Sequence, residues 1–139
     1  MTERTPILSF RIDEPYAIAL RMVRIALARQ GLRAPAELDI TARIRQELGV
    51  EVAPCIVLYV DDPEVLLGAF IFNRGAALRI PQPLVVTGDN DYTDVLVRSS
   101  EMSVGDAPEA TRDSLFDLST RILQAIESIA QGARFLVNF

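Results

Sequence analysis

The chain of 139 residues contains no histidine and no lysine, and its single cysteine is Cys55. The absence of histidine excludes Ser-His-Asp and Cys-His catalytic arrangements and removes the commonest base and metal ligand at neutral pH. The absence of lysine excludes Schiff-base chemistry. Catalysis would have to use Asp, Glu, Tyr, Arg, Ser, Thr or one thiol, and the sequence names no reaction for them.

A long hydrophobic run and a basic cluster are also missing. Val65 to Phe72 is the longest apolar stretch. It is much shorter than the roughly 20 residues that a membrane-spanning helix needs, so we interpret it as a core segment and expect no membrane partner. All 14 basic residues are arginines, and the net charge is −5. Because binding to phosphates needs a positive face, we expect no nucleic-acid partner.

Nothing in the sequence marks the chain for export. The first residues lack a basic segment followed by an apolar stretch and a small-residue cleavage site, and a lone cysteine cannot form an intramolecular disulfide. We therefore expect a cytoplasmic protein.

Length and composition predict one domain spanning residues 1–139, with residues 1–5 frayed. A chain of this length buries roughly 70% of its unfolded surface, and half of its residues are hydrophobic, so an ordinary hydrophobic core is available. Gly68, Gly75 and Gly88 are too scattered for a nucleotide-binding loop. We expect no cofactor.

Hydrophobic spacing and turn residues predict the order of the elements. Strands are predicted at 7–12, at 32–38 on a sheet edge because of Pro35, and at 55–60, where a continuous apolar run suggests burial on both faces. Further strands are predicted at 77–80, 83–88 and 92–99, the last two as a hairpin. Helices are predicted from an Asp13 cap to Gln30, from Asp39 or Thr41 to Leu48, from Asp61-Asp62-Pro63 to about residue 72, and from Asp106 to Gly132. This order indicates an α+β fold, with a mixed or antiparallel sheet, helices packed mainly on one face and a long C-terminal helix.

Three stretches carry a resemblance to a known family. They are residues 31–50 (GLRAPAELDITARIRQELGV), Asp61-Asp62-Pro63, and Ile80-Pro81-Gln82. In order and spacing the chain resembles, from about Ser9 to Ile129, the family known as domain of unknown function 302 (DUF302). The family has Cys-Asn-Pro and Leu-Pro-Cys in the last two places, so Asp61 and Gln82 replace its two motif cysteines. The resemblance implies a compact α+β fold, self-association and an uncharacterised activity, and it implies no reaction.

Asp61 and Asp62 have two interpretations, a folding device or a reactive pair. Asp62 stands where the family has Asn, and both residue types are strong N-caps, so we predict that Asp62 caps the helix starting at Pro63. Adjacent carboxylates act as acid and base only where burial or crowding separates their pKa values. Side chains at neighbouring positions of a helix start usually point apart, which favours the cap.

We single out five candidate ligand-binding residues and assign none as catalytic. Asp61 and Gln82 occupy the motif positions, where they cannot copy any metal or redox chemistry of thiolates. Glu37 has no structural task that the sequence reveals. Tyr59 and Arg79 offer a hydroxyl and a guanidinium near the end of the sheet.

Two weaker features have simpler explanations. The segment from Asp89 to Ser100 fails the 12-residue calcium pattern at positions six and twelve, so we expect a solvated hairpin turn and no metal site. Cys55 opens a strand and has no basic neighbour in the sequence, which favours an inert thiol.

Residues 133–139, ARFLVNF, form an apolar C-terminal tail. Chain ends are usually polar, and an apolar patch of this kind is usually covered. Two alternatives stay open: the tail adds an edge strand to its own sheet, or it packs on a second subunit.

These observations favour a homodimer that binds a partner or a small-molecule ligand without catalysis, in a mostly apolar cleft. The alternative is a carboxylate-dependent enzyme, such as a lyase, isomerase or metal-assisted hydrolase, built around Asp61, Glu37 and Tyr59. A close, water-shielded cluster of these three side chains would favour the enzyme, and their separation would favour the binding module.

Overall fold

The computed structural model describes residues 7–136, of which residues 102 and 132–136 are described by their backbone alone. The elements are β1 (Ile7–Ile12), α1 (Tyr16–Arg29), β2 (Arg33–Asp39), α2 (Ile40–Leu48), β3 (Cys55–Asp61), α3 (Pro63–Phe72), the 3₁₀ helix η1 (Arg74–Leu78), β4 (Gln82–Gly88), β5 (Thr93–Arg98), α4 (Ser100–Val104), α5 (Glu109–Glu127) and β6 (Gln131–Leu136). The predicted frayed residues 1–5 lie outside the described residues.

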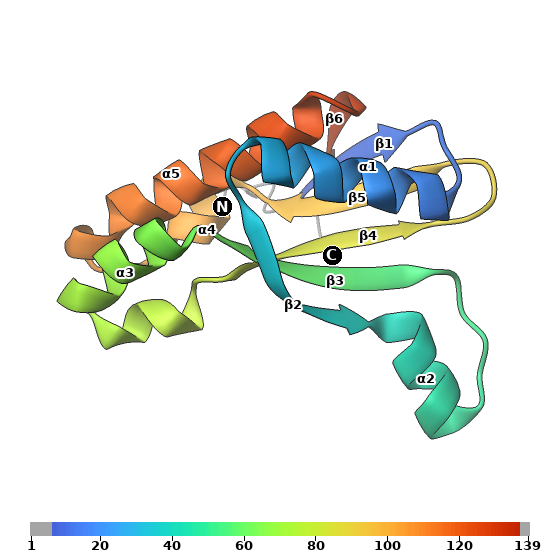
Figure 1. Ribbon diagram of the computed structural model, residues 1–139, viewed down its shortest axis with the longest axis horizontal. Coiled ribbons are helices and arrows are strands. Elements are labelled where there is room, and N and C mark those ends of the chain that lie inside the picture. The colour runs from blue at the N-terminus through green and yellow to red at the C-terminus, as the bar shows by residue number, and fades with distance from the viewer. Residues whose placement is uncertain (1–6, 137–139) are drawn as a thin grey trace, which may run out of the picture.

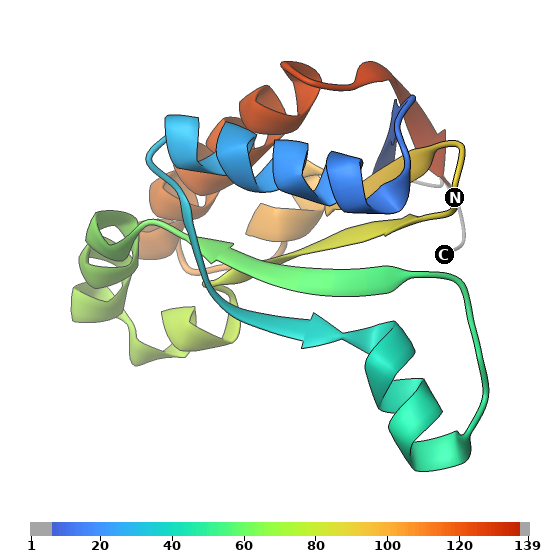
Figure 2. The same ribbon diagram turned by 45° about the vertical axis from the view of Figure 1, so that its right-hand side comes forward.

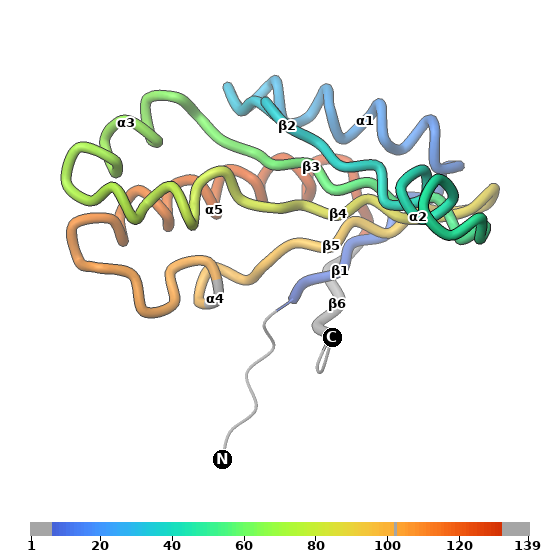
Figure 3. Tube along the Cα trace, turned by 90° about the horizontal axis from the view of Figure 1, so that it is seen from below, coloured from blue at the N-terminus to red at the C-terminus, as the bar shows by residue number. Residues whose placement is uncertain are grey.

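Within this part of the chain, six strands form one sheet in the order β2-β3-β4-β5-β1-β6, and every neighbouring pair is antiparallel. Helices α1 and α5 lie together over one face (Figure 1). Figure 3 shows α2 in front of the strands and α5 behind them. The predicted α+β fold, with helices mainly on one face and a long C-terminal helix, is confirmed.

The core lies between the sheet and the two helices that cover it. Alternate strand residues point toward α1 and α5, because successive side chains of a strand face opposite sides. The fully buried members of this core include Phe10, Leu58, Leu84, Val86 and Val95 from the strands and Val23, Leu115, Leu118 and Ile126 from the helices. Burying one such side chain contributes roughly 1.5–3 kcal/mol.

The predicted burial of residues 55–60 on both faces is wrong. Ile56, Leu58 and Val60 are buried, whereas the residues that alternate with them, Cys55, Val57 and Tyr59, are only half-buried. Within the described residues, α1 and α5 cover one face of the sheet (Figure 1), so the run of β-forming residues reflects strand propensity more than two-sided burial.

Helix boundaries follow local signals at some ends and tertiary contacts at others. Asp39 caps α2 as predicted, with its Oδ1 accepting from the Ala42 N–H at 2.9 Å, and Gly49 ends that helix with a φ of 66°. The predicted Asp13 cap of α1 is wrong. Pro15 holds the N-cap position without a side-chain bond, and the Tyr16 N–H donates to the Asp89 carbonyl at 3.1 Å.

Residues 77–80, predicted as a strand, are not one. The chain forms η1 up to Leu78 and then turns into β4. The Asn73 side chain favours the 3₁₀ turn, because its Oδ1 accepts from the Gly75 N–H at 2.8 Å.

The first part of the apolar tail adds an edge strand to its own sheet. Residues 133–136 belong to β6, which pairs with β1. Residues 137–139 lie outside the described residues. Among the helices described, none combines the length and the apolar character needed to cross a bilayer.

Candidate functional site

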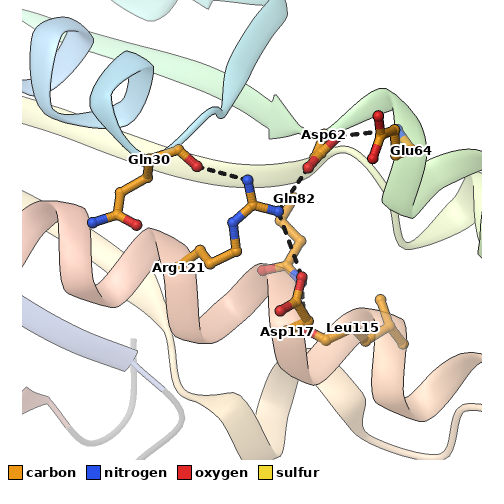
Figure 4. A network of polar contacts seen from close by, with 7 residues as sticks. All are labelled: Gln30, Asp62, Glu64, Gln82, Leu115, Asp117 and Arg121. Atoms are coloured by element: carbon orange, nitrogen blue, oxygen red, sulfur yellow. Dashed lines mark hydrogen bonds and ion pairs between the residues drawn. The ribbon is translucent and has the colours of Figure 1, made fainter.

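The junction between β3 and α3 holds both carboxylates of the motif, and Asp62 has a structural task there. Its Oδ1 accepts from the Glu64 N–H at 2.9 Å, and its Oδ2 accepts from Arg121 Nη1 at 2.7 Å (Figure 4). The bond from Arg121, followed by the backbone N–H of Glu64, lowers the pKa of Asp62. The predicted cap is confirmed, and the partner on α5 is an addition that the sequence did not indicate.

Arg121 joins three elements at this junction. Besides Asp62, it contacts Asp117 on its own helix, with Nη1 and Oδ2 3.5 Å apart, and its Nη2 donates to the Gln30 carbonyl at 2.6 Å. Its guanidinium therefore ties α5 to the end of α1 and to the start of α3 (Figure 4). An arginine on an amphipathic helix gives no sequence signal for such a role, because its partners are distant in the chain.

Asp61 lies in a different environment from its neighbour. It is 5% exposed, and in the β2–β3 pair it lies opposite Arg33. Burial is the main cause that raises the pKa of Asp61; the charge of Asp62 raises it further, and Arg33 lowers it. The two adjacent carboxylates thus have pKa values shifted in opposite directions.

Tyr59 and Glu37 point to opposite sides of the sheet. Glu37 pairs in register with Leu58, whereas Tyr59 is the next residue of β3 and pairs with Ala36. Glu37 forms an ion pair with Arg24 of α1, with Oε2 and Nη2 2.8 Å apart. The structure therefore gives Glu37 a surface partner and does not bring it together with Tyr59.

Gln82 and Arg79 each have partners of their own. Gln82 is 4% exposed, and its Nε2 is 3.5 Å from the Leu115 carbonyl of α5 (Figure 4). Its Oε1 accepts from Ser103 Oγ at 3.3 Å. Arg79 forms an ion pair with Asp106 at 2.7 Å. The five predicted residues do not share one cluster.

An apolar cavity lies between α3 and η1, and sequence reasoning missed it. Its volume is about 530 Å³. The lining residues are Pro63, Leu66, Leu67, Phe70, Ala77, Ile80 and Pro81. We call this cavity the α3–η1 pocket; none of its lining side chains is ionisable.

Helix α3 also corrects the interpretation of 65–72 as a core segment. Only Ala69 is buried in α3, whereas Leu67, Ile71 and Phe72 are 59%, 67% and 73% exposed. A helix that is apolar around its whole circumference is normally covered on all sides. The missed signal was therefore the lack of a polar face in PEVLLGAFIF. A helix without a polar face leaves apolar side chains exposed to water when it lies at the end of a sheet and other elements cover only part of it.

A smaller cavity of about 210 Å³ lies near the start of α2, and its lining includes Tyr16, Asp39, Thr41 and Cys55. Two of these side chains have structural tasks: Asp39 caps α2, and Thr41 Oγ1 accepts from the Cys55 backbone N–H at 2.8 Å. Burial raises the pKa of the Cys55 thiol, which disfavours the nucleophilic thiolate. Across the described residues, no three His, Cys, Asp or Glu side chains gather as metal ligands.

Comparisons with known proteins agree with this architecture. A solved structure titled as an uncharacterised conserved protein DUF302 from Bacillus stearothermophilus superposes with a TM-score of 0.77 at 18% sequence identity, covering 88% of this chain and 97% of that chain. No curated protein matches the sequence. The family described as domain of unknown function DUF302 matches residues 8–129. This match spans most of the chain, so the protein belongs to the DUF302 family.

Proposed function

We propose that the protein is a homodimeric module that binds a small, uncharged, apolar molecule in the α3–η1 pocket and catalyses no reaction on it. The observation that carries this proposal is the pocket itself: about 530 Å³ of space lined only by apolar side chains. Ligand pockets of small molecules commonly have volumes of roughly 300–1,000 Å³ and mostly apolar walls.

The chemistry of the lining selects the class of ligand. A charged group placed there would lose its hydration without gaining a partner, which costs several kcal/mol. A linear or cyclic hydrocarbon skeleton gains roughly 25 cal/mol for each Å² of apolar surface removed from water. We therefore expect an alcohol or hydrocarbon to bind more tightly than a carboxylate of the same length.

The enzyme alternative has less support. Glu37 is paired with Arg24 on the helix side of β2, away from Tyr59 on the opposite side. Asp61 alone retains an unusual environment, with its pKa raised mainly by burial. One carboxylate with a shifted pKa, without a positioned acid or nucleophile beside it, does not define a catalytic site.

The location and remaining partners are part of the proposal. Cys55 is the single cysteine and cannot form an intramolecular disulfide, which supports a location in the reducing cytoplasm. The net charge of −5 and the absence of a basic cluster in the sequence support a ligand other than nucleic acid.

Calorimetric titration with linear alcohols of six to twelve carbons, and with the matching carboxylates, tests the proposal. We expect saturable binding of the alcohols with a negative heat-capacity change, and weaker binding of the carboxylates. Ala77→Trp should fill the pocket and weaken binding at least tenfold. Ala28→Trp, at an exposed alanine of α1 outside the pocket lining, is the matched control. Absence of saturable binding, or equal binding by the two variants, would refute the proposed site.

A further inference from the structure

Asp61 is a buried carboxylate that has no hydrogen-bond partner among the described residues. The residue is 5% exposed, and it forms no hydrogen bond or ion pair with any residue that the structure describes. Its neighbour Asp62, in contrast, accepts from both Glu64 and Arg121. Native structures seldom keep a buried carboxylate unpaired, because nothing then offsets the loss of its hydration.

The carboxylate oxygens of Asp61 remain accessible although most of the residue is covered. Across the described residues, every fully buried side-chain oxygen or nitrogen has a hydrogen-bond partner. Because the Asp61 carboxylate has no such partner, its oxygens are not fully buried and carry part of the exposure that the residue retains. A donor group of a bound molecule can therefore reach the carboxylate through this opening.

Asp61 stands at the base of the α3–η1 pocket. Figure 2 shows β3 (green) running into α3 and η1 (yellow-green) leading into β4 at the same end of the sheet. In the β3–β4 pair, Val60 lies opposite Gln82. The next step of this register sets Asp61 across from Pro81. Pro81 lines the pocket, and so does Pro63, two residues after Asp61.

The direction of the strand side chains agrees with this placement. Val60 belongs to the core, and the side chain of Gln82 reaches the Leu115 carbonyl of α5. Successive side chains of a strand face opposite sides of the sheet, so Asp61 points away from α5. This direction leaves the carboxylate free to face the pocket, whose lining includes no residue of α5.

We propose that Asp61 is the polar anchor of the α3–η1 pocket and accepts a hydrogen bond from the hydroxyl of a bound aliphatic alcohol. This inference rests on the proposed function and narrows its ligand class from uncharged apolar molecules to alcohols. The alkyl chain lies among the apolar side chains that line the pocket, and the hydroxyl lies at the carboxylate. Ligand sites commonly combine apolar walls with a few polar groups that fix the orientation of the ligand.

The charges around Asp61 favour a hydroxyl over an ionised head group. A carboxylate ligand would meet two adjacent anions, Asp61 and Asp62. An ammonium has three N–H donors to satisfy, and Asp62 is already engaged by Arg121. Arg33 lies opposite Asp61 on β2 and repels a second cation. A hydroxyl brings one donor and no charge, so a single carboxylate satisfies it.

Calorimetric titration with 1-octanol and with methyl heptyl ether at pH 8 tests the anchor. The two molecules have the same number of carbon and oxygen atoms, but the ether has no O–H donor. A hydrogen bond to a charged group should make the wild type bind the alcohol about tenfold more tightly than the ether.

Substitution of Asp61 should remove this preference. Asp61→Leu should lower the affinity for the alcohol about tenfold without lowering that for the ether. Asp61→Asn keeps an accepting oxygen without the charge, so the preference should fall about threefold and not vanish. Glu64→Gln removes an exposed carboxylate from the same junction and should change neither affinity. Far-ultraviolet circular dichroism checks that each variant is folded.

The outcomes separate this inference from the proposed function. Equal binding of alcohol and ether by the wild type, or unchanged alcohol affinity in folded Asp61→Leu, overturns the anchor and leaves the pocket as a purely apolar site. If Asp61→Leu does not fold, an alcohol preference in Asp61→Asn equal to that of the wild type overturns the anchor. Tighter binding of octylamine than of octanol overturns the choice of a hydroxyl. Failure of both alcohol and ether to bind the wild type refutes the proposed function and the anchor together.

Discussion

Arg121 of α5 donates a 2.7 Å hydrogen bond to Asp62, the residue that caps α3. The same guanidinium reaches the end of α1 through the Gln30 carbonyl. Because α3 forms one wall of the α3–η1 pocket, this contact positions the proposed ligand site from the far end of the chain. Asp62, the N-cap of α3, therefore also connects the core helix α5 to the wall of the pocket.

The Asp62–Arg121 contact should be measurable as a coupling energy. Asp62→Ala removes the cap and the ion pair and should lower the free energy of unfolding by about 1–2 kcal/mol. Asp62→Asn keeps a capping oxygen, so its loss should be smaller, about 0.5–1 kcal/mol. A urea double-mutant cycle with Arg121→Met isolates the pair. Equal losses for Asp62→Ala and Asp62→Asn would show that the cap contributes nothing.

Asp61 should make stability depend on pH in the opposite sense from Asp62. The pKa of Asp61 is raised in the folded protein, mainly by burial, so its favourable contribution is complete below its ordinary value of about 3.9 and is lost as the pH rises through the raised pKa. For Asp62 the folded pKa is lowered, so its contribution is present above the ordinary value and is lost as the pH falls.

Asp61→Asn tests this sign. The amide carries no charge to bury, so the variant should be more stable than the wild type at pH 7, and the difference should shrink toward pH 3. Urea unfolding at both values measures the difference. Glu64→Gln, which removes an exposed carboxylate from the same junction, is the control. A variant less stable than the wild type at pH 7 would mean that charged Asp61 has a favourable partner there.

The parts of the fold that could be predicted from the sequence are those set by local chemistry. Asp39 and Asp62 are caps in the sequence and in the structure, because a cap depends on the N–H groups of the next three residues. The Asp13 prediction failed because a carbonyl from the distant hairpin, at Asp89, meets the helix start instead. Local sequence patterns do not reveal a hydrogen-bond acceptor that comes from a distant part of the chain and replaces a side-chain cap.

The site could not be predicted for a related reason. Glu37, Tyr59, Asp61, Arg79 and Gln82 were chosen for their chemistry and their position near strand ends. Strand alternation sends Glu37 and Tyr59 to opposite sides of the sheet, and Arg79 follows η1 and belongs to no strand. Conversely, the apolar α3 segment was taken for core because composition does not say what covers a helix. Coverage depends on how the other elements pack around it.

Two glycines should respond oppositely to alanine. At Gly88, in the β4–β5 hairpin, an added Cβ would lie 2.7 Å from the Tyr92 carbonyl oxygen and 2.8 Å from Thr93 Cα, so Gly88→Ala must displace backbone and should destabilise the protein. At Gly68, within α3, nothing outside the neighbouring residues and backbone of its own helix lies within 4 Å of the added Cβ. Gly68→Ala should raise the free energy of unfolding by about 0.5–1 kcal/mol, because alanine loses less backbone entropy in a helix. Thermal unfolding of both variants decides the matter, and a destabilised Gly68→Ala would indicate that α3 needs its glycine for contacts outside the chain.

Tyr16 should be recognisable in a titration of the native protein. Burial, with smaller contributions from Asp39 and Cys55, raises its pKa to about 12. Its contribution to stability is therefore complete below the ordinary value near 10 and is lost as the pH rises through about 12. Absorbance at the tyrosinate band should show a step near pH 12 that disappears in Tyr16→Phe and moves toward pH 10 in urea. If the absorbance that Tyr16→Phe removes titrates near pH 10 in the native protein, then the phenol is solvated and the small cavity beside α2 is open to water.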